Sequence, residues 1–446
     1  MNFEYYSLPK NIELRRRKDY CFIINNYSQT IQILHPSEAV LLCFLDGTTN
    51  ISDLIYLIKE IYRISQIEAT SFVIETIKKT KNFLISSNKK TKSINNYNPL
   101  DYIKIQYSEN LKNELLNPFY LDIILSKKCN FKCFYCYNET EKINNKLLSK
   151  KLLINIIDQA KKLEIQQIYL NGGEPFLHPD ILDIIKYIKS RDIFVNISTN
   201  ASLLNKQYIT ALSKEIDVIQ VSLDSNKPNI HHNMTRSNNT FEKIIDNIKL
   251  LISKGIMVRT NAVITLENYP FVEEYIDYMI NIGVFEIRIT LQDYESCEKS
   301  TSTFHIFNSE QINILKELII CKKKEKNFER INLVIAKTKK WENKNDIIKC
   351  PNIKNTITIF PNGNVGVCDR IENDKNLIYG NINNESLSDL WYGKRHLNLI
   401  KNITDKSDCK KCRFLEDCST GCFNLSKATY GDPFAKDPRC EIISEN

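Results

Sequence analysis

Apolar and polar positions along the first 92 residues predict a small α+β unit. The stretch YCFIINNYSQTIQIL (20–34) has an apolar run, a polar turn and a second, alternating run, a pattern typical of a β-hairpin. SEAVLLCFLDGT predicts a helix that ends at Gly47, and SDLIYLIKEIYRIS predicts a second helix behind a cap at Ser52 or Asp53. A third helix is expected at about 68–83. The unit therefore has the order and size of a winged-helix-like domain.

The pattern changes after an Asn- and Lys-rich stretch, which predicts a linker over 93–117. From there to about residue 340, short apolar strands alternate with amphipathic helices, an order that favours an α/β fold with a parallel sheet wrapped by helices. Six such units over 118–340 predict a partial (β/α)6 TIM-like barrel, where chemistry collects at the carboxyl ends of the strands. The expected strands are 120–125, 168–170, 193–198, 218–223, 257–263 and 285–289.

Composition excludes several other classes of protein. The chain has 446 residues with only 11 Gly and 12 Pro, which argues against disordered or collagen-like architecture. It has no run of about 20 apolar residues that could span a membrane and no apolar signal core near its start, so we expect a cytoplasmic protein. The net charge is +8, and its scattered basic runs predict solvated faces, with an acidic peptide or a nucleic acid as the alternative partner.

The 14 cysteines point to metal rather than to disulfides, because a reducing compartment keeps thiols reduced. Three of them, Cys129, Cys133 and Cys136, follow the first expected barrel strand with the spacing C-x3-C-x2-C. Three thiolates can hold three irons of a [4Fe–4S] cluster and leave the fourth iron open to a small molecule. A stray zinc knuckle is the alternative for this spacing.

This loop resembles the hallmark of the radical S-adenosylmethionine (SAM) superfamily, with the aromatic residue before the last cysteine at Tyr135. NGGEP, after the second strand, matches the superfamily's GGE motif. The resemblance implies that Gly172 and Gly173 let the backbone approach the cofactor and that Glu174 receives its ammonium group. It further implies ribose and carboxylate contacts, although Ala201 and Ser225 replace glycines of the matching motifs. These contacts are expected at Ser198, Asn200, Ser222 and Arg236.

The last region, 346–446, contains seven further cysteines, among which Cys409, Cys412, Cys418 and Cys422 have the spacing C-x2-C-x5-C-x3-C. This order resembles the SPASM domain, which holds auxiliary [4Fe–4S] clusters, with a pair of zinc ribbons as the alternative. The resemblance implies two auxiliary clusters, so the chain is expected to hold three clusters together with the one at the three-cysteine loop. The resemblance also places a candidate base at Asp369, which could equally orient its loop by bonding backbone amides. The implied ligands are Cys350, Cys368 and Cys422 for one auxiliary cluster, and Cys409, Cys412, Cys418 and Cys440 for the other. Some members of the resembling family have an eighth cysteine between the positions of Cys350 and Cys368, and this chain has none there. The first auxiliary cluster is therefore expected to have three protein ligands and one open site.

The N-terminal unit resembles PqqD-like domains, which hold the leader of a ribosomally made precursor peptide by adding it as a strand to a sheet edge. A winged-helix DNA binder or a structural cap is the alternative for this unit. The three parts in this order resemble peptide maturases, with the closest likeness to thioether-forming enzymes of the subtilosin type. The resemblance implies SAM-derived radical chemistry on a peptide, with electrons from a reductant such as flavodoxin or ferredoxin and no nucleic acid as partner.

Other outcomes stay open on the same framework. A radical SAM protein of this build could epimerise residues, join carbon to carbon, decarboxylate, or oxidise a sulfatase residue. A non-catalytic, metal-scaffolded protein that binds nucleic acid is the alternative from a different class. The NGGEP stretch separates these classes, because a zinc scaffold has no need of a carboxylate at that strand end.

Overall fold

The computed structural model describes most of the chain in two compact units, residues 1–115 and 116–446. The described residues are 4–17, 20–25, 31–92, 97–105, 115–136, 146–216, 218–292, 307–334, 352–372, 374–406, 409–412, 415–418, 421–438 and 440. Each unit has its own core, and each is presented by itself.

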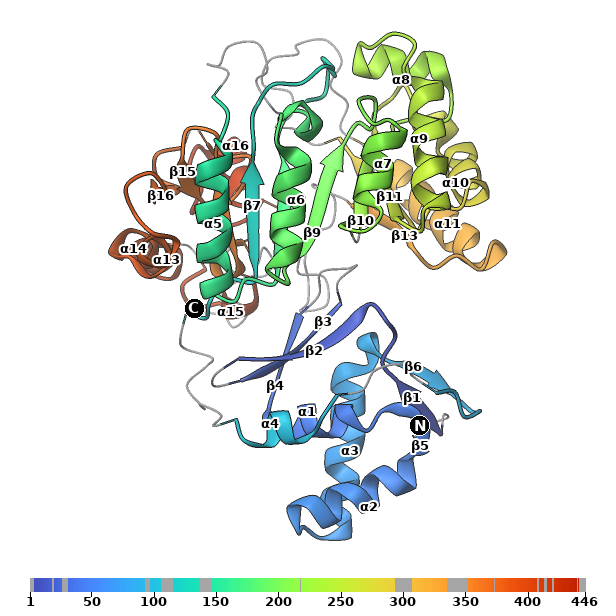
Figure 1. The fold of residues 1–446 in the computed structure, drawn as a ribbon, viewed down its shortest axis with the longest axis vertical. Helices are drawn as coiled ribbons and strands as arrows, with labels where there is room; N and C mark the ends of the chain where they lie inside the picture. Colours follow the sequence, from blue (N-terminus) through green and yellow to red (C-terminus); the bar gives the residue numbers. More distant parts are fainter. Residues whose placement is uncertain are drawn as a thin grey trace. The chain divides into compact units, whose positions relative to one another are not determined.

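The N-terminal unit contains two three-stranded sheets and three longer helices (Figure 1). One sheet has the order β5-β1-β6, and the other is an antiparallel sheet with the order β2-β3-β4. The strands are β1 (Tyr5–Ser7), β2 (Ile12–Arg16), β3 (Cys21–Asn25), β4 (Ile31–Leu34), β5 (Asp46–Asn50) and β6 (Ile85–Ser87). The helices are α1 (Pro36–Cys43), α2 (Ile51–Tyr62), α3 (Gln66–Thr80) and the short α4 (Leu100–Ile103).

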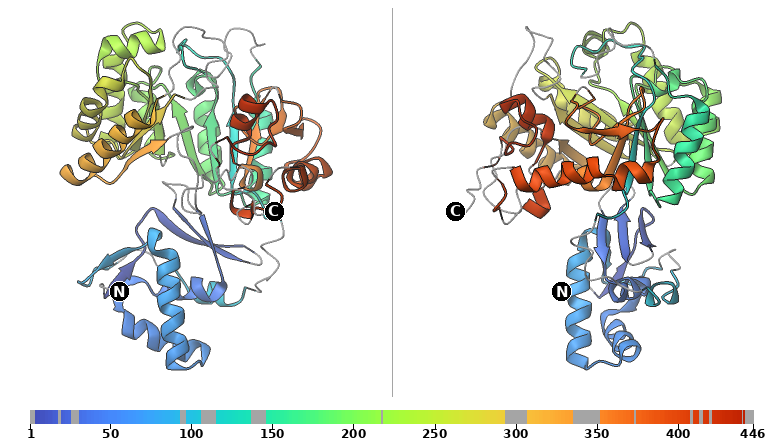
Figure 2. Two further views of the ribbon diagram at one scale, coloured as in Figure 1. Left: turned by 180° about the vertical axis from the view of Figure 1, so that it is seen from behind. Right: turned by 90° about the vertical axis from the view of Figure 1, so that its left-hand side faces the viewer.

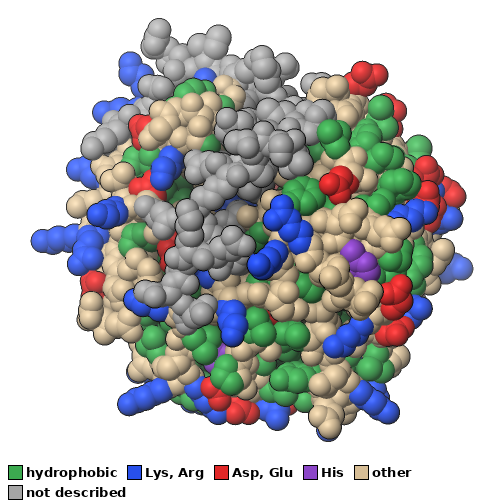
Figure 3. Space-filling model, turned by 90° about the horizontal axis from the view of Figure 1, so that it is seen from above, with side chains coloured by type: hydrophobic (Ala, Val, Ile, Leu, Met, Phe, Trp, Pro, Cys, Tyr) green, Lys and Arg blue, Asp and Glu red, His purple; other side chains and the backbone are tan. Residues whose placement is uncertain are grey.

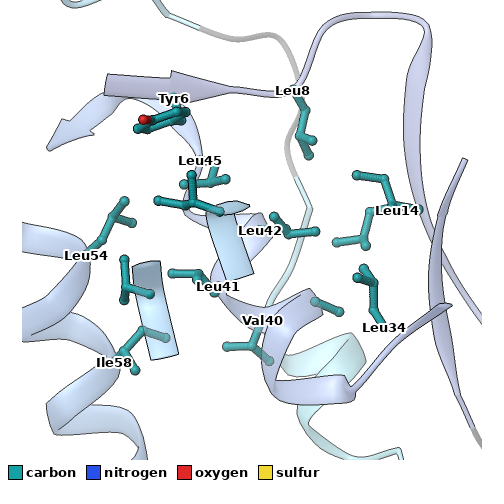
Figure 4. Packing of buried hydrophobic residues seen from close by; sticks show 14 of the residues in the cluster. Tyr6, Leu8, Leu14, Leu34, Val40, Leu41, Leu42, Leu45, Leu54 and Ile58 are labelled. Atoms are coloured by element: carbon teal, nitrogen blue, oxygen red, sulfur yellow. The ribbon is translucent and has the colours of Figure 1, made fainter. Parts of the chain in front are cut away.

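The core of this unit lies between the strands and the helices α1 and α2 (Figure 4). Leu41 and Leu42 of α1 have no exposed surface, and they pack with Leu54 and Ile58 of α2. Burying a leucine side chain stabilises a fold by roughly 1.5–3 kcal/mol, so this cluster is the main attraction that holds the unit together. The predicted hairpin is present as β3 and β4, while its turn lies outside the described residues.

Two helix boundaries differ from the sequence-based prediction. The helix α1 ends at Cys43, and Gly47 lies in β5 at φ 77°, where an added Cβ would stand 1.8 Å from the carbonyl oxygen of Thr91. Gly47 is thus needed for a close backbone approach rather than to end a helix. The cap of α2 is Asn50, whose side chain accepts from the amide of Asp53.

The stretch predicted as a linker contributes to the N-terminal core. Tyr102 is only 5% exposed, and Tyr97 packs against the same cluster. The amide of Leu14 donates to the Tyr97 hydroxyl (3.1 Å), and the Tyr102 hydroxyl donates to the Leu14 carbonyl (2.9 Å). These bonds give partners to the amide and carbonyl of Leu14, which lie on the outer edge of β2 and would otherwise be unpaired. The predicted boundary at residue 92 therefore falls too early.

The second unit is built on one ten-stranded sheet with the order β13-β12-β11-β10-β9-β8-β7-β14-β15-β16 (Figures 1 and 2). All pairs from β13 to β14 are parallel, and β15 and β16 add an antiparallel edge. The strands are β7 (Tyr120–Ile124), β8 (Gln167–Asn171), β9 (Phe194–Thr199), β10 (Val218–Ser222), β11 (Met257–Ile264), β12 (Glu286–Leu291), β13 (Ile331–Val334), β14 (Thr356–Ile359), β15 (Asn364–Gly366) and β16 (Ile378–Asn381).

The six strands that the sequence predicts correspond to β7–β12, each within two residues at its ends. Helices follow them along the chain because their apolar stripes need a sheet face to cover. In α5, for example, Leu153, Ile156 and Ile157 are fully buried. The α/β class is thus confirmed, while closure of the sheet into a partial barrel and the winged-helix-like character of the first unit stay predictions. The helices are α5 (Lys150–Lys162), α6 (Ile181–Ser190), α7 (Lys206–Leu212), α8 (Pro228–Thr235), α9 (Phe241–Ser253), α10 (Val272–Asn281) and α11 (Ser309–Glu325).

The C-terminal region joins this sheet through β14, which pairs in parallel with β7. The described helices of this region are α12 (Asn352–Asn355), α13 (Leu387–Tyr392), α14 (Lys394–Lys406), α15 (Leu415–Cys418) and α16 (Phe423–Tyr430). Trp391 is fully buried, and its indole donates to the Leu116 carbonyl (2.8 Å). The cysteine-rich region is therefore continuous with the parallel sheet. Across the described ranges, no helix combines the length and apolarity that a membrane crossing requires.

We predict that Tyr102→Phe destabilises the N-terminal unit. The substitution leaves the buried carbonyl of Leu14 without its donor, which typically costs about 1–3 kcal/mol. Thermal unfolding of the full chain, followed by circular dichroism, measures the shift. Tyr56→Phe is the matched control, because Tyr56 is 60% exposed and its hydroxyl is accessible to water. Equal melting curves for wild type and Tyr102→Phe would contradict the assigned role.

Candidate active site at the carboxyl ends of the strands

The three-cysteine loop begins directly after β7 and is held by backbone bonds on two sides. On one side, the amides of Gly173 and Glu174 donate to the carbonyls of Ser126 (2.7 Å) and Lys128 (2.9 Å). On the other side, the amides of Lys132 and Phe134 donate to carbonyls at the end of α8, at 3.1 Å each. The loop thus stands at the edge where the parallel strands end, the face shown in Figure 3.

The two glycines of NGGEP are required by the chain itself. A Cβ at Gly172 would lie 2.4 Å from the Ser126 carbonyl oxygen, and one at Gly173 would lie 2.2 Å from that of Lys128. Gly172 also has φ 148°, a backbone region that L-residues rarely adopt. The glycines therefore let the segment after β8 approach residues 126–128, which connect β7 to the first cysteine. Their approach to a cofactor stays a prediction.

The three thiols lie close enough to influence one another electrostatically. Burial raises the pKa of Cys129 to about 11, with smaller contributions from Glu174 and Cys136. Burial also raises the pKa of Cys133, and the charges of Asp224 and Cys136 add to the effect. A bound cation stabilises thiolates against such a cost. Three thiolate donors in one loop fit an iron–sulfur cluster. In the parts of the chain that the structure describes, no three His, Cys, Asp or Glu side chains converge on one metal ion.

Glu174 is buried at 2% exposure and accepts three hydrogen bonds from the protein. Oε1 accepts from the Thr199 hydroxyl (2.7 Å) and the Phe176 amide (3.0 Å), and Oε2 accepts from the Asn200 amide (2.8 Å). Burial raises its pKa, while these donors lower it. The carboxylate thus ties the end of β8 to the end of β9. Its contact with an ammonium group stays a prediction.

Asn200 connects the end of β9 to the cysteine loop. The side-chain amide of Asn200 donates to Oδ1 of Asn130 (2.9 Å), and Oδ1 of Asn200 accepts from the Ser202 hydroxyl (2.6 Å). Asn130, the residue after Cys129, donates in turn from its side-chain amide to that hydroxyl (2.8 Å). Ser198 accepts from the side chain of Gln220 (2.9 Å). These bonds pre-position the residues that the sequence assigns to the cofactor.

Ala201, which stands where relatives have glycine, adopts the left-handed conformation at φ 58°. This conformation costs an L-residue about 1–2 kcal/mol, and it explains why glycine suits the position. The turn is kept by the amide of Asn247, which donates to the Ala201 carbonyl (2.9 Å). Alanine in place of glycine therefore makes this left-handed turn energetically more costly, and the bond from Asn247 helps to hold the turn.

Tyr135 is fixed by a hydrogen bond to Asp224, which the sequence did not single out. The hydroxyl donates to Oδ2 of Asp224 at 2.5 Å, and Oδ1 accepts from the amide of Val263 (3.0 Å). Burial raises the pKa of Asp224 to about 6, and both bonds oppose that rise. Asp224 lies between Ser222, an expected cofactor contact, and Ser225, so the segment after β10 also anchors the cysteine loop.

The other sequence-predicted positions at this edge differ in exposure. Ser222 is partly buried at the end of β10, and Arg236 is exposed at the left-handed cap of α8. His231 has no exposed surface and packs against Phe131 of the cysteine loop, and burial lowers its pKa to about 4. His232 accepts from the first amides of α9. Both side chains thus pack or bond within the protein at this edge.

Four of the C-terminal cysteines lie near enough for three of them to act electrostatically on Cys418. Burial raises the pKa of Cys418 to about 12, and the charges of Cys409, Cys440 and Cys412 add to this rise. Asp437, which the sequence analysis missed, organises the group. Its Oδ2 accepts from the amide of Cys422 (2.8 Å), and its carbonyl accepts from that of Cys440 (2.9 Å). The four-thiol donor set fits a second cluster, and Cys350 lies outside the described residues.

Asp369 faces a second carboxyl group that the sequence analysis did not identify. Its Oδ1 accepts from the thiol of Cys368 (3.3 Å). Asp122, on β7, accepts from the side-chain amide of Asn171 (2.6 Å). Burial raises the pKa of Asp122 to about 8, and the charge of Asp369 adds to the rise. Strand alternation could have flagged Asp122, because a carboxyl group in an apolar strand demands a partner.

Comparison with known families identifies two regions of the chain. Residues 123–279 match the model of the radical SAM superfamily. Residues 350–418 match that of SPASM, an iron–sulfur cluster-binding domain.

Among curated proteins, the probable GTP 3′,8-cyclase of Saccharolobus islandicus is 33% identical over 173 residues, or 38% of this chain. The chain spans only 55% of the length of that relative. The tungsten-containing aldehyde ferredoxin oxidoreductase cofactor-modifying protein of Pyrococcus furiosus is 24% identical over 349 residues, which cover 72% of this chain and 93% of that protein.

Among solved structures, Streptococcus suis SuiB bound to S-adenosylmethionine shares the fold with a TM-score of 0.68 at 19% identity. The match covers 98% of this chain and 100% of that one. SuiB has also been solved with its precursor peptide SuiA, and this structure matches with a TM-score of 0.67. Native anSMEcpe with bound AdoMet matches 72% of this chain with a TM-score of 0.55.

We predict that Gly173→Ala impairs SAM binding. The new Cβ would push the Lys128 carbonyl away and displace the start of the cysteine loop, and such overpacking costs about 1–3 kcal/mol. Equilibrium dialysis of the iron-loaded protein with labelled SAM measures the affinity. Gly255→Ala is the control, because its Cβ would meet open space and only the positive φ would cost stability. Equal SAM affinity in the two variants would refute the prediction.

We also predict a pH-dependent effect of Asp122→Asn on stability. The folded-state pKa of Asp122 is raised to about 8, so its contribution to stability is full below pH 4 and is lost as the pH rises toward 8. The variant lacks this loss, and its melting temperature relative to wild type should increase between pH 5 and pH 8. A constant difference over this range would show that Asp122 is ionised in the fold.

Proposed function

We propose, from the premise that this chain carries a radical SAM domain followed by a SPASM domain, that it modifies a ribosomally made precursor peptide. The reaction proposed is the formation of thioether links between cysteine sulfurs and carbon atoms of the peptide. SAM and [4Fe–4S] clusters are its cofactors, with three clusters expected, and flavodoxin or ferredoxin is its proposed electron donor.

The observation that carries the proposal is the placement of the Cys368 loop beside β7. The pairing of β14 with β7 brings the cysteine-rich region alongside the strand that leads into the three-cysteine loop. A peptide at the carboxyl ends of the strands would thus have both cysteine groups within its reach. The similarity to SuiB, which covers 98% of this chain, supports a peptide as substrate.

The chain's own residues bind and orient the reactants. Cys129, Cys133 and Cys136 would hold the first cluster, and when bound it supplies the electron that cleaves SAM into methionine and a 5′-deoxyadenosyl radical. Ser198, Asn200, Ser222 and Arg236 are proposed to contact SAM, as are Gly172–Glu174. Asp369, whose Oδ1 lies 3.3 Å from the sulfur of Cys368, is proposed as the base that accepts a proton from a peptide thiol.

The N-terminal unit is proposed to hold the leader at the outer edge of β4. The tyrosine bonds to Leu14 occupy the outer edge of β2. Residues of an antiparallel strand alternate between its two edges, so the register Leu14↔Ile23 and Ile23↔Gln32 directs the backbone of Ile33 away from β3. Among the described strands, none pairs with that side of β4. An extended leader can add there as a further strand.

Other reactions share this framework. Peptide epimerisation, carbon–carbon cross-linking and oxidation of a sulfatase residue use the same cofactors. A nucleotide substrate is suggested by the name of the Saccharolobus islandicus relative, although that match covers only 38% of this chain. A non-catalytic protein that binds nucleic acid is the remaining alternative.

The test is to produce the protein anaerobically together with a candidate precursor peptide that contains cysteine. Each thioether link removes two hydrogen atoms, so mass spectrometry should show a loss of about 2 Da per link on cysteine-containing fragments. A peptide in which cysteine is replaced by alanine should stay unmodified. Modification without change of mass would instead identify an epimerase, and absence of 5′-deoxyadenosine from iron-loaded protein would favour the non-catalytic alternative.

We predict that Ile33→Pro abolishes peptide modification and spares cleavage of SAM in the absence of peptide. Proline removes the outward amide of β4 and is tolerated at a sheet edge, so the sheet itself should persist. Leader affinity by fluorescence anisotropy and 5′-deoxyadenosine by chromatography measure the two effects. Ile33→Ala keeps the amide and is the matched control. Equal leader affinity in both variants would place the leader elsewhere.

A further inference from the structure

An ion pair joins the three-cysteine loop to the loop that follows Cys368. The ammonium group of Lys127 lies against Oε2 of Glu372, and the two side chains are only 13% and 12% exposed. Lys127 precedes Cys129 by two residues, and Glu372 follows Cys368 by four. Because the pair is largely withdrawn from water, it is screened less by salt than surface pairs are.

The loop that carries Glu372 is held from its other side as well. Asp374 is 6% exposed, and its Oδ2 lies 3.0 Å from the Nζ of Lys427 on α16. The amide of Asp374 donates to the Ile371 carbonyl (2.9 Å), and that of Ile371 donates to the Cys368 carbonyl (3.3 Å). The helix α16 begins directly after Cys422. Two ion pairs thus connect segments that bear Cys129, Cys368 and Cys422.

The backbone next to Lys127 is also held by hydrogen bonds. Lys128, the next residue, accepts at its carbonyl from the Glu174 amide (2.9 Å) and donates from its amide to the Ser126 hydroxyl (3.0 Å). Neither end of the pair can therefore shift without moving a cysteine loop. Lys128 itself is exposed, so this stretch contains one paired and one solvated lysine.

We propose that Lys127 and Glu372 are positioning residues that set the three-cysteine loop against the Cys368 loop and balance the charge beside the first loop. The inference rests on the proposed function only in that it assigns an iron–sulfur cluster to Cys129, Cys133 and Cys136. Neither residue touches the reacting atoms. Loss of one partner leaves an uncompensated charge of known sign close to that cluster.

The test uses the iron-loaded full chain and the variants Lys127→Gln, Glu372→Gln and the double variant. Redox potentiometry followed by electron paramagnetic resonance gives the potential of the cluster whose signal changes when SAM is added. Removing the positive charge should shift this potential to more negative values, and removing the negative charge should shift it to more positive values. The double variant should lie between the two single variants.

Lys128→Gln is the matched control, because it removes the same charge from an exposed position and should shift the potential far less. Lys127→Arg keeps the charge and should restore the potential, and iron content and melting temperature establish that each variant is folded. Shifts of the same sign in both single variants, no shift, or an equal shift in Lys128→Gln would each overturn the charge-balancing role.

Positioning is tested separately by the ratio of modified peptide to SAM cleaved. Displacement of the two loops should lower this ratio roughly tenfold in Glu372→Gln, because misplaced reactants lose rate steeply. An unchanged ratio would overturn the positioning role. The potentials need no peptide, so a chain that shows the expected shifts and modifies no peptide would refute the proposed substrate and retain this inference.

Discussion

The close backbone contact between residues 126–128 and 172–174 is the constraint on which the rest of the site depends. Two amides of the NGGEP stretch bond to carbonyls just before the first cysteine, and only glycine leaves room for that approach. The contact continues the β7–β8 ladder beyond the ends of the strands. It converts a loop of three cysteines into a fixed extension of the sheet.

Buried polar groups extend this order around the site. Glu174 satisfies donors from β9, Asn200 reaches back to Asn130, and Asp224 holds Tyr135. Each buried polar atom that finds a partner avoids a cost of about 1–3 kcal/mol, so the network favours a single arrangement of the loop. Groups that the motifs suggest as cofactor contacts are in this structure also the groups that hold one another in place.

The unpaired backbone groups of a sheet edge are covered differently in the two units. In the second unit, β14 from the cysteine-rich region covers the β7 edge of the parallel sheet, and this pairing places Asp369 near Asp122. In the first unit, two tyrosines from the following segment cap β2 and leave β4 as the edge strand on the other side. The pairing of β14 with the β7 edge thus brings two carboxyl groups together. The capping of the β2 edge leaves the outer side of β4 as the place where a further strand can pair.

The sequence by itself determined the parts that depend on local pattern. Strand and helix periodicity predicts β7–β12 and the order of the units, because alternation and the 3.6-residue stripe are properties of neighbouring residues. Cysteine spacing likewise assigns the radical SAM and SPASM regions, which the family matches confirm. The tertiary structure alone decided which distant groups meet. Asp122 and Asp369, Tyr135 and Asp224, and Lys127 and Glu372 are between 89 and about 250 residues apart, and no local pattern carries their pairing. The parallel order of the strands brings Tyr135 and Asp224 to one edge. The pairing of β14 with β7, followed by the antiparallel return of β15, brings Asp369 near Asp122 and Glu372 against Lys127.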